Sequence, residues 1–225
     1  AGLTQSLQSA LLLTLTILLG LGMTFLVSRL LSATVLKGVP SSFTLELPPY
    51  RRPQLGKVLV RSVFDRTLFV LGRAITVAAP AGILLWVMAN VGIQGQSLLA
   101  WASGFLDPLG RFMGLDGVIL IAFILGFPAN EIVIPIIIMA YMANGSLIEM
   151  SSLSAMKDLF LAQGWTLTTA VCTLIFVLFH WPCSTTCLTI YKETKSIKWT
   201  AAAILIPTVC GVVCCSLAAF ILRMF

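Results

Sequence analysis

One short stretch of the sequence holds most of the side chains that could bind a metal ion. It contains the only histidine, His180, followed by Cys183 and Cys187. Imidazole and thiolate groups suit borderline-soft divalent metals, Fe(II) and Zn(II) among them. The cysteine spacing places both sulfurs on one side of a helix, but it is not a zinc-finger pattern. These residues are candidate metal ligands. The alternatives are packing as small apolar residues for the cysteines and a hydrogen bond to a freed carbonyl for His180.

A proline interrupts the backbone beside these candidate ligands. The apolar run from Trp165 to Phe179 is shorter than the roughly 20 residues that a bilayer crossing needs. Pro182 lacks a backbone N–H, so a helix must kink or break there. Broken backbone inside a membrane is tolerated only where it is buried in protein or lines a wet cavity. We expect the hydroxyls that follow to support the broken backbone, namely those of Ser184, Thr185 and Thr186.

A second apolar segment, Gly117 to Ala143, is also interrupted. Its middle contains Pro128 and, two residues later, Asn130. Paired proline-interrupted membrane segments that carry polar groups point to the substrate site of a transporter. We therefore expect the two breaks to face each other across a path for a small cation, with Pro128, Asn130 and Pro182 supporting that path.

Glu131 is the only acidic residue within an apolar segment. Burying its carboxylate in the middle of a membrane costs at least about 2.5–3.5 kcal/mol, so the group needs a partner. The functional interpretation is a cation ligand or a proton carrier. The structural alternatives are an ion pair with Arg73 or Arg29, or capping of the N–H groups freed after the preceding proline.

The composition is that of an integral membrane protein. The chain is 59% hydrophobic and 10% charged, with a mean hydropathy of +1.03, whereas soluble domains carry about 25% charged residues. The net charge of +6 comes from basic residues beside apolar runs, which favours anionic lipid as the partner and argues against nucleic acid. The sequence has no P-loop and no Gly-x-Ser-x-Gly motif, so we expect no enzymatic activity in this chain.

The pattern predicts an all-α, polytopic helical bundle with about four to five apolar segments, two of them interrupted or re-entrant. Residues 1–36 form the first transmembrane span. Residues 37–66 form a basic cytoplasmic connection with an amphipathic helix from Gln54 to Phe69, which either lies on lipid or docks a cytoplasmic domain. Residues 67–225 form the transmembrane core. No basic segment precedes the first span, so we expect no signal peptide. The start at Ala1 fits a mature fragment or the later part of a longer polypeptide.

Two topologies fit the apolar segments. If the segment from Gly117 to Ala143 crosses the membrane once, the basic loop from Lys192 to Lys198 lies opposite the first basic connection. If that segment dips in and returns, both basic regions are cytoplasmic. The positive-inside rule favours the re-entrant arrangement.

Three motifs carry a family resemblance. They are Glu46–Arg51 (ELPPYR), Gly126–Pro135 (GFPANEIVIP) and Trp181–Thr186 (WPCSTT), the last followed by Lys192–Thr194. In this order they resemble the C-terminal membrane region of the bacterial ferrous-iron transport protein B (FeoB) family. The last motif resembles the second of that family's two Gate segments, here residues 164–191, which is also found in nucleoside-transporter-like proteins.

The resemblance implies a multi-pass protein of the bacterial inner membrane that takes up Fe²⁺ as its transported substrate, with no tightly bound cofactor. It implies that Cys183 lies on or near the metal path and that Glu131 matches the acidic position of the middle motif. GTP and Mg²⁺ would bind an N-terminal GTPase domain, which this sequence lacks together with the first Gate segment. Both would be partners from the same or another polypeptide.

Further expected partners are a small FeoA-like cytoplasmic protein, membrane lipid and, as a candidate assembly, a homo-oligomer. Three other functions stay open at this point. The chain could belong to a transporter of nucleosides or other organic solutes, it could be a non-transporting structural subunit, or it could be an intramembrane hydrolase.

Overall fold

The computed structural model describes residues 3–34, 55–93, 95–142 and 152–224. The predictions for residues 35–54, including the motif Glu46–Arg51, lie outside these described residues. Contacts divide the chain into two units, Ala1–Arg66 and Thr67–Phe225, which are described separately. Apart from turns and a two-stranded hairpin, the described residues are helical, which confirms the predicted all-α fold.

The first unit contains one long apolar helix, α1 (Leu3–Ala33). Its stretch Ser6–Ala33 is long and apolar enough to cross a membrane, as predicted for this part of the chain. The hydroxyls of Thr14, Thr16 and Thr24 each donate to the carbonyl four residues earlier, at 2.6–2.8 Å. These polar groups are therefore satisfied within the helix, as an apolar environment requires.

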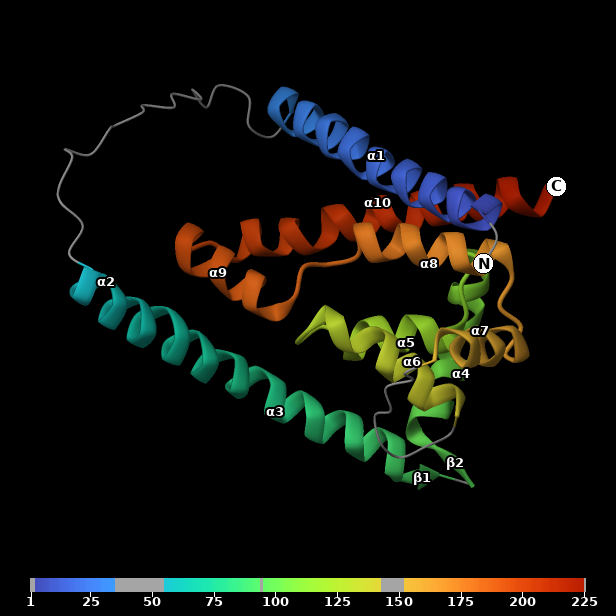
Figure 1. The fold of residues 1–225 in the computed structure, drawn as a ribbon, viewed down its shortest axis with the longest axis horizontal. Coiled ribbons are helices and arrows are strands. Elements are labelled where there is room, and N and C mark those ends of the chain that lie inside the picture. Colours follow the sequence, from blue (N-terminus) through green and yellow to red (C-terminus); the bar gives the residue numbers. More distant parts are fainter. Residues whose placement is uncertain (1–2, 35–54, 94, 143–151, 225) are drawn as a thin grey trace. The chain divides into compact units, whose positions relative to one another are not determined.

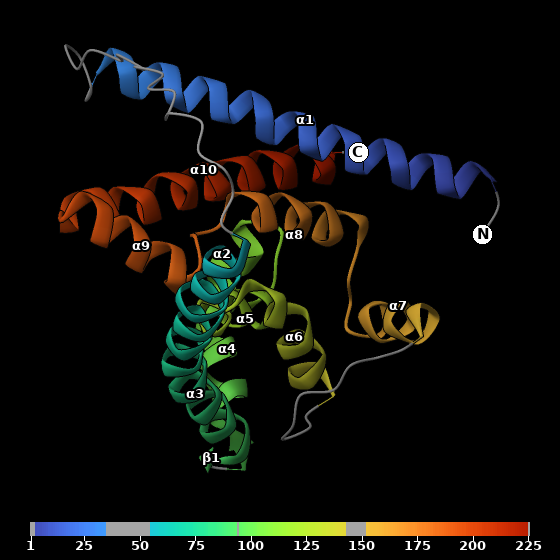
Figure 2. The ribbon, with the colours of Figure 1, turned by 60° about the vertical axis from the view of Figure 1, so that its left-hand side comes forward.

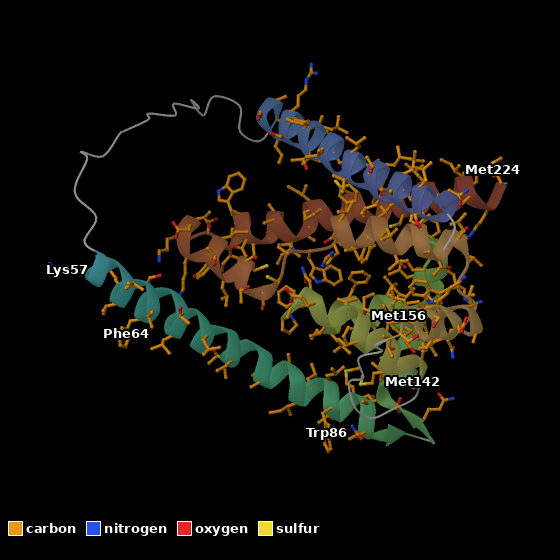
Figure 3. All side chains as sticks on the ribbon, in the orientation of Figure 1. Lys57, Phe64, Trp86, Met142, Met156 and Met224 are labelled. Atoms are coloured by element: carbon orange, nitrogen blue, oxygen red, sulfur yellow. The ribbon has the colours of Figure 1, made fainter. Side chains whose placement is uncertain are left out.

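The predicted amphipathic helix is not a separate element. α2 (Leu55–Arg61), the π-helical segment η1 (Ser62–Leu68) and α3 (Phe69–Asn90) follow one another without a gap. No proline or glycine occurs from residue 57 to residue 71 to end the helix. In α3, Leu85 is buried, while the neighbouring Trp86 is 61% exposed and projects outward (Figure 3).

A sharp corner follows α3. Strands β1 (Gly92–Ile93) and β2 (Gln96–Ser97) form a small antiparallel hairpin, which leads into α4 (Leu98–Phe112). α4 and α5 (Gly117–Leu125) are bent by 110°. A Cβ atom at Gly117 would stand 1.8 Å from the carbonyl oxygen of Ser103. Only glycine therefore allows α4 and α5 to approach this closely.

The interrupted segment 117–143 folds back on itself. After α5, the chain breaks at Pro128, forms a short 3₁₀ turn η2 (Asn130–Ile132) and returns as α6 (Val133–Tyr141). α5 and α6 pack against each other, and each contains fully buried residues, such as Ile119 and Ile136. The path is the one that the re-entrant topology predicts. We call this unit, residues 117–141, the re-entrant hairpin.

The C-terminal part contains α7 (Leu153–Ala162), α8 (Leu167–Phe179), α9 (Ser184–Thr194) and α10 (Ile197–Met224). α8 ends before Pro182, and the chain resumes as α9, which confirms the predicted break. Both helices lie along α10 (Figures 1 and 2). The face of α10 that contacts them includes the buried small residues Gly211, Cys215 and Ala219, which permit close approach of helices.

Three helical stretches within the described residues are long and apolar enough to span a membrane: Ser6–Ala33, Leu167–Thr194 and Ile197–Met224. The bent pair Leu98–Phe112 and Gly117–Leu125 also passes the test when taken together. The re-entrant hairpin stands beside these elements as a short, interrupted one. These features confirm a polytopic helical membrane fold with interrupted segments.

Candidate functional site

The two breaks in the chain are in direct contact. The backbone N–H of Ser184, the first residue of α9, donates to the carbonyl of Phe127 at 2.9 Å. The Ser184 hydroxyl donates to the carbonyl of Pro128 at 3.4 Å. Ser184 is 7% exposed. Ser184 therefore hydrogen-bonds to backbone carbonyls at a break, as predicted. Those carbonyls belong to the other break, at Phe127 and Pro128.

The tip of the re-entrant hairpin presents polar side chains. Asn130 and Glu131 begin η2, and both are exposed. Among the described residues, Glu131 has neither an ion pair nor a hydrogen bond. The side chain of Arg73 is not among those described, and Arg29 lies in the other unit. Glu131 is exposed among the described residues, so its carboxylate does not need the partner that a buried carboxylate would require.

His180 stands at the end of α8 with one ring nitrogen satisfied and the other free. Nδ1 donates to the carbonyl of Val177 at 2.7 Å and lies 3.2 Å from that of Phe176. Two carbonyl acceptors require a proton on Nδ1, so in the neutral imidazole the lone pair is on Nε2. Nε2 is buried and has no partner among the described residues. A neutral imidazole with a free, buried Nε2 has the form of a metal ligand.

Aromatic rings surround this histidine. The ring of Phe123, from α5, lies 5.0 Å from the His180 ring, and those of Trp181 and Phe176 lie 6.2 and 6.3 Å away. Phe123 and Phe176 pack edge to face at 4.8 Å. The re-entrant hairpin and α8 thus pack through aromatic side chains beside His180.

Cys183 is the N-cap residue of α9, which begins at Ser184. Its sulfur lies 3.0 Å from the hydroxyl of Thr185 and 3.2 Å from that of Thr186. Hydroxyl donors and the N-terminal end of a helix both favour the thiolate, which is the form that binds metals. Cys187 is buried, and its thiol points back to the carbonyl of Pro182 at 3.4 Å.

The predicted ligands are not gathered into one cage. Within the described residues, no group of three or more His, Cys, Asp or Glu side chains stands close enough to hold a metal ion. The contact between the breaks brings Cys183 and Cys187 to the same region as the hairpin tip, while Glu131 stays exposed. The assignment of His180, Cys183, Cys187 and Glu131 as ligands of one ion remains a prediction.

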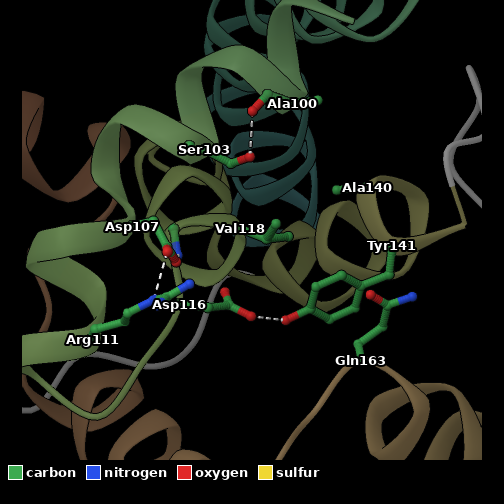
Figure 4. Close-up of a pocket in the computed structure, with 11 residues that line it drawn as sticks. Ala100, Ser103, Asp107, Arg111, Asp116, Val118, Ala140, Tyr141 and Gln163 are labelled. Atoms are coloured by element: carbon green, nitrogen blue, oxygen red, sulfur yellow. Dashed lines mark hydrogen bonds and ion pairs between the residues drawn. The ribbon is translucent and has the colours of Figure 1, made fainter. Parts of the chain in front are cut away.

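A second polar cluster lies at the base of the re-entrant hairpin, around a cavity of about 390 Å³ (Figure 4). Asp116 caps α5 by accepting the N–H of Ile119 at 2.7 Å, and it accepts a hydrogen bond from the hydroxyl of Tyr141. Asp107 accepts the N–H of Gly117 at 3.2 Å and forms an ion pair with Arg111 at 2.6 Å. These contacts hold the corner between α4 and α5.

Sequence reasoning missed the residues of this cluster. Asp116 carries a recognisable signal, because an Asp directly before an apolar run is a typical N-cap. Tyr141 and Trp165, whose Nε1 donates to the Tyr141 oxygen at 2.8 Å, carry none. Their partners lie 24 and 25 residues away along the chain, and no short-range pattern links residues at that separation.

The sequence of this chain matches two family models that together cover most of its length. Residues 71–197, which include both breaks, match the Gate family, described as nucleoside recognition. Residues 13–65 match the ferrous iron transport protein B C terminus. The chain belongs to the Gate family. The Gate-like segment predicted at residues 164–191 falls within the matched region.

Curated relatives are ferrous-iron transporters by name. The Fe(2+) transporter FeoB of Staphylococcus aureus (strain MSSA476) is 32% identical over 212 residues, which cover 90% of this chain and 30% of that protein. The FeoB of Synechocystis is 30% identical and covers 90% of this chain and 32% of its own length. This chain thus spans about a third of the length of these relatives. No solved structure matches it.

Proposed function

We propose that this chain is the membrane part of a ferrous-iron uptake transporter and that Fe²⁺ passes where the two breaks meet. The observation that carries the proposal is the pair of hydrogen bonds from Ser184 to the carbonyls of Phe127 and Pro128. Transporters place their sites at such meeting points of broken helices. The names of the relatives supply the identity of the ion.

The residues around the contact have distinct proposed roles. Cys183, at the N-terminal end of α9, offers a thiolate, and His180 offers the free Nε2 lone pair. Glu131 attracts the cation at the exposed hairpin tip, and Cys187 provides a second sulfur one turn into α9. Few ligands at each position suit a path, because an ion must leave each site as readily as it enters.

The backbone and hydroxyl groups at the breaks support the path. Pro128 and Pro182 keep the two interruptions open, and Asn130 lines the hairpin tip. Ser184 joins the breaks, while Thr185 and Thr186 hold the Cys183 sulfur. Sulfur, imidazole and carboxylate together favour Fe²⁺ over hard cations such as Mg²⁺.

The driving reaction belongs to other parts of the transporter. Because the relatives are about three times longer than the matched region, we propose that a GTPase domain with bound Mg²⁺ and a first Gate segment act together with this chain in the bacterial inner membrane. Residues 37–66 would face the cytoplasm and couple to that domain. A FeoA-like protein and a second copy of the chain are further proposed partners.

Anaerobic uptake of Fe(II) by cells that express the complete transporter tests this function. Cys183→Ser should lower uptake by at least about tenfold with normal expression, because losing a metal ligand costs at least as much as losing an outer-shell partner. Cys210→Ser, a change at a half-buried cysteine of α10, is the matched control and should leave uptake unchanged. Unchanged uptake in Cys183→Ser removes this cysteine from the path.

A nucleoside or related organic solute is the second candidate substrate. The description of the Gate family favours it. A competition experiment separates the candidates. Excess Mn(II) or Co(II) should compete with Fe(II) uptake, whereas excess nucleosides should not.

A further inference from the structure

Three residues form a continuous chain of hydrogen bonds at the base of the re-entrant hairpin. The carboxylate of Asp116 accepts from the hydroxyl of Tyr141, and the Tyr141 oxygen accepts from Nε1 of Trp165 at 2.8 Å. We call these three residues the base network. Since Asp116 also caps α5 through Ile119, one carboxylate holds the beginning of α5 and the end of α6 together.

The base network also reaches the helix that leads to the second break. Trp165 stacks on Phe160 of α7, with ring centroids 4.3 Å apart and planes 11° from parallel. The next residue, Thr166, is the N-cap of α8 and accepts the N–H of Thr169 at 3.3 Å. The indole is therefore held in place two residues before α8 begins at Leu167.

Two short helices connect the base network to the two breaks. α5 has nine residues and is about 14 Å long, and it leads from Asp116 to Phe127. α8 has 13 residues and is about 20 Å long, and it leads from Trp165 to His180. At their far ends the breaks are joined by Ser184. The contacts thus form a closed ring with the base network on one side and the candidate ion path on the other.

We infer that the base network sets how closely the hairpin tip is held against the second break, so that Tyr141 and Trp165 are positioning residues for the path. The inference rests on the proposed function only in taking the contact between the breaks as that path. A packed helix moves as a unit, so a shift at its base displaces its far end. Loss of a base-network hydrogen bond separates the tip from α9 and makes Cys183 more accessible.

Alkylation of Cys183 measures this accessibility without iron. The complete polypeptide in isolated membranes is treated anaerobically with N-ethylmaleimide, and the labelling of each cysteine is followed by peptide mass spectrometry. Tyr141→Phe and Trp165→Phe keep an aromatic ring and remove one hydrogen-bonding group each. Each should label Cys183 about two- to tenfold faster than wild type, the range expected when one intramolecular hydrogen bond is lost.

The double variant and two controls identify the mechanism. Tyr141→Phe already removes the acceptor of Trp165, so the double variant should label no faster than Tyr141→Phe. Tyr191→Phe, at an exposed tyrosine of α9, should behave as wild type. Cys210 of α10 serves as an internal reference in every sample, and its labelling should not change.

The inference is overturned if both single variants label Cys183 at the wild-type rate, or if their effects on that rate add in the double variant. It is also overturned if labelling of Cys210 rises as much as that of Cys183, because this would report general loosening of the protein. Because the assay contains no iron, its result does not depend on the cargo. If the variants change the labelling of Cys183 as expected but the wild-type transporter takes up no iron, only the proposed function is contradicted.

Discussion

The carboxylate of Asp116 and the hydroxyl of Tyr141 are joined by a hydrogen bond across 25 residues of sequence. Everything between them, from α5 through the break at Pro128 to α6, therefore begins and ends at one place. A segment that crossed a membrane once would have its ends on opposite sides. This bond places the two ends of residues 117–141 side by side, as the re-entrant arrangement predicts.

The re-entrant arrangement predicts that both basic regions face the same side of the membrane. Cysteines introduced as Lys57→Cys and Lys195→Cys, both at exposed lysines, should react with a membrane-impermeant maleimide only from the cytoplasmic side, in agreement with the positive-inside rule. The experiment compares inverted with right-side-out vesicles. Labelling of the two positions from opposite sides would contradict the arrangement.

Because α4 and α5 meet closely at their corner, alanine substitutions at two glycines should change stability by different amounts. Gly117→Ala places a Cβ against the backbone oxygen of Ser103, which cannot move aside without shifting α4. We expect a loss of at least about 1–3 kcal/mol of stability from this overpacking. Gly104→Ala, in α4 and with open space around it, should be neutral or stabilising. Thermal unfolding in detergent provides the comparison, and equal stability of the two variants would contradict the described corner.

Two substitutions of His180 should affect stability and Fe(II) uptake differently. In His180→Asn, the side-chain amide can still donate to the carbonyl of Val177, while the free Nε2 is lost. This variant should express normally and lose Fe(II) uptake by about tenfold or more, if Nε2 contacts the ion. His180→Phe loses the donor as well and should also be less stable, by about 1 kcal/mol. Wild-type uptake in His180→Asn would limit His180 to a structural role.

We expect helix α4 to lie at the membrane interface. Its 15 residues give a length of about 22 Å, which is short of the roughly 30 Å hydrocarbon core. It is bent by 110° from α5, and Trp101, Phe105 and Phe112 are 62–79% exposed. Aromatic side chains of this kind favour the headgroup region.

Spin labels measure that position. A label at Phe105→Cys should report a shallow depth by power-saturation electron paramagnetic resonance, whereas one at Val213→Cys, an exposed position within the long helix α10, should report a deep one. Equal depths at the two positions would place α4 within the hydrocarbon core instead.

The breaks were predictable from the sequence because proline acts locally. Pro128 and Pro182 each lack the N–H that a continuing helix needs, and the apolar runs beside them are too short to span a membrane. The candidate ligands could also be named in advance, since His180 and Cys183 stand out by residue type alone. The chain's membrane character followed directly from its composition.

The contacts between distant residues were not predictable in this way. Nothing in the local pattern connects Ser184 with Phe127, or Tyr141 with Trp165, because each bond depends on how whole helices pack. The exposure of Glu131 has the same origin. Its place within an apolar run indicated burial, but it sits at the tip of a hairpin, where this part of the chain leaves it uncovered. The predicted amphipathic helix Gln54–Phe69 continues into the next span without a gap, because an amphipathic pattern does not by itself end a helix.

Protection of Cys183 by its proposed cargo tests the central claim most directly. Labelling of the complete transporter with N-ethylmaleimide is measured anaerobically with and without Fe(II), and Cys210 serves as the reference. If Fe²⁺ passes where the breaks meet, it should slow labelling at Cys183 but not at Cys210, and the protection should weaken in Glu131→Gln. Equal labelling of Cys183 with and without Fe(II) would contradict a path between the two breaks.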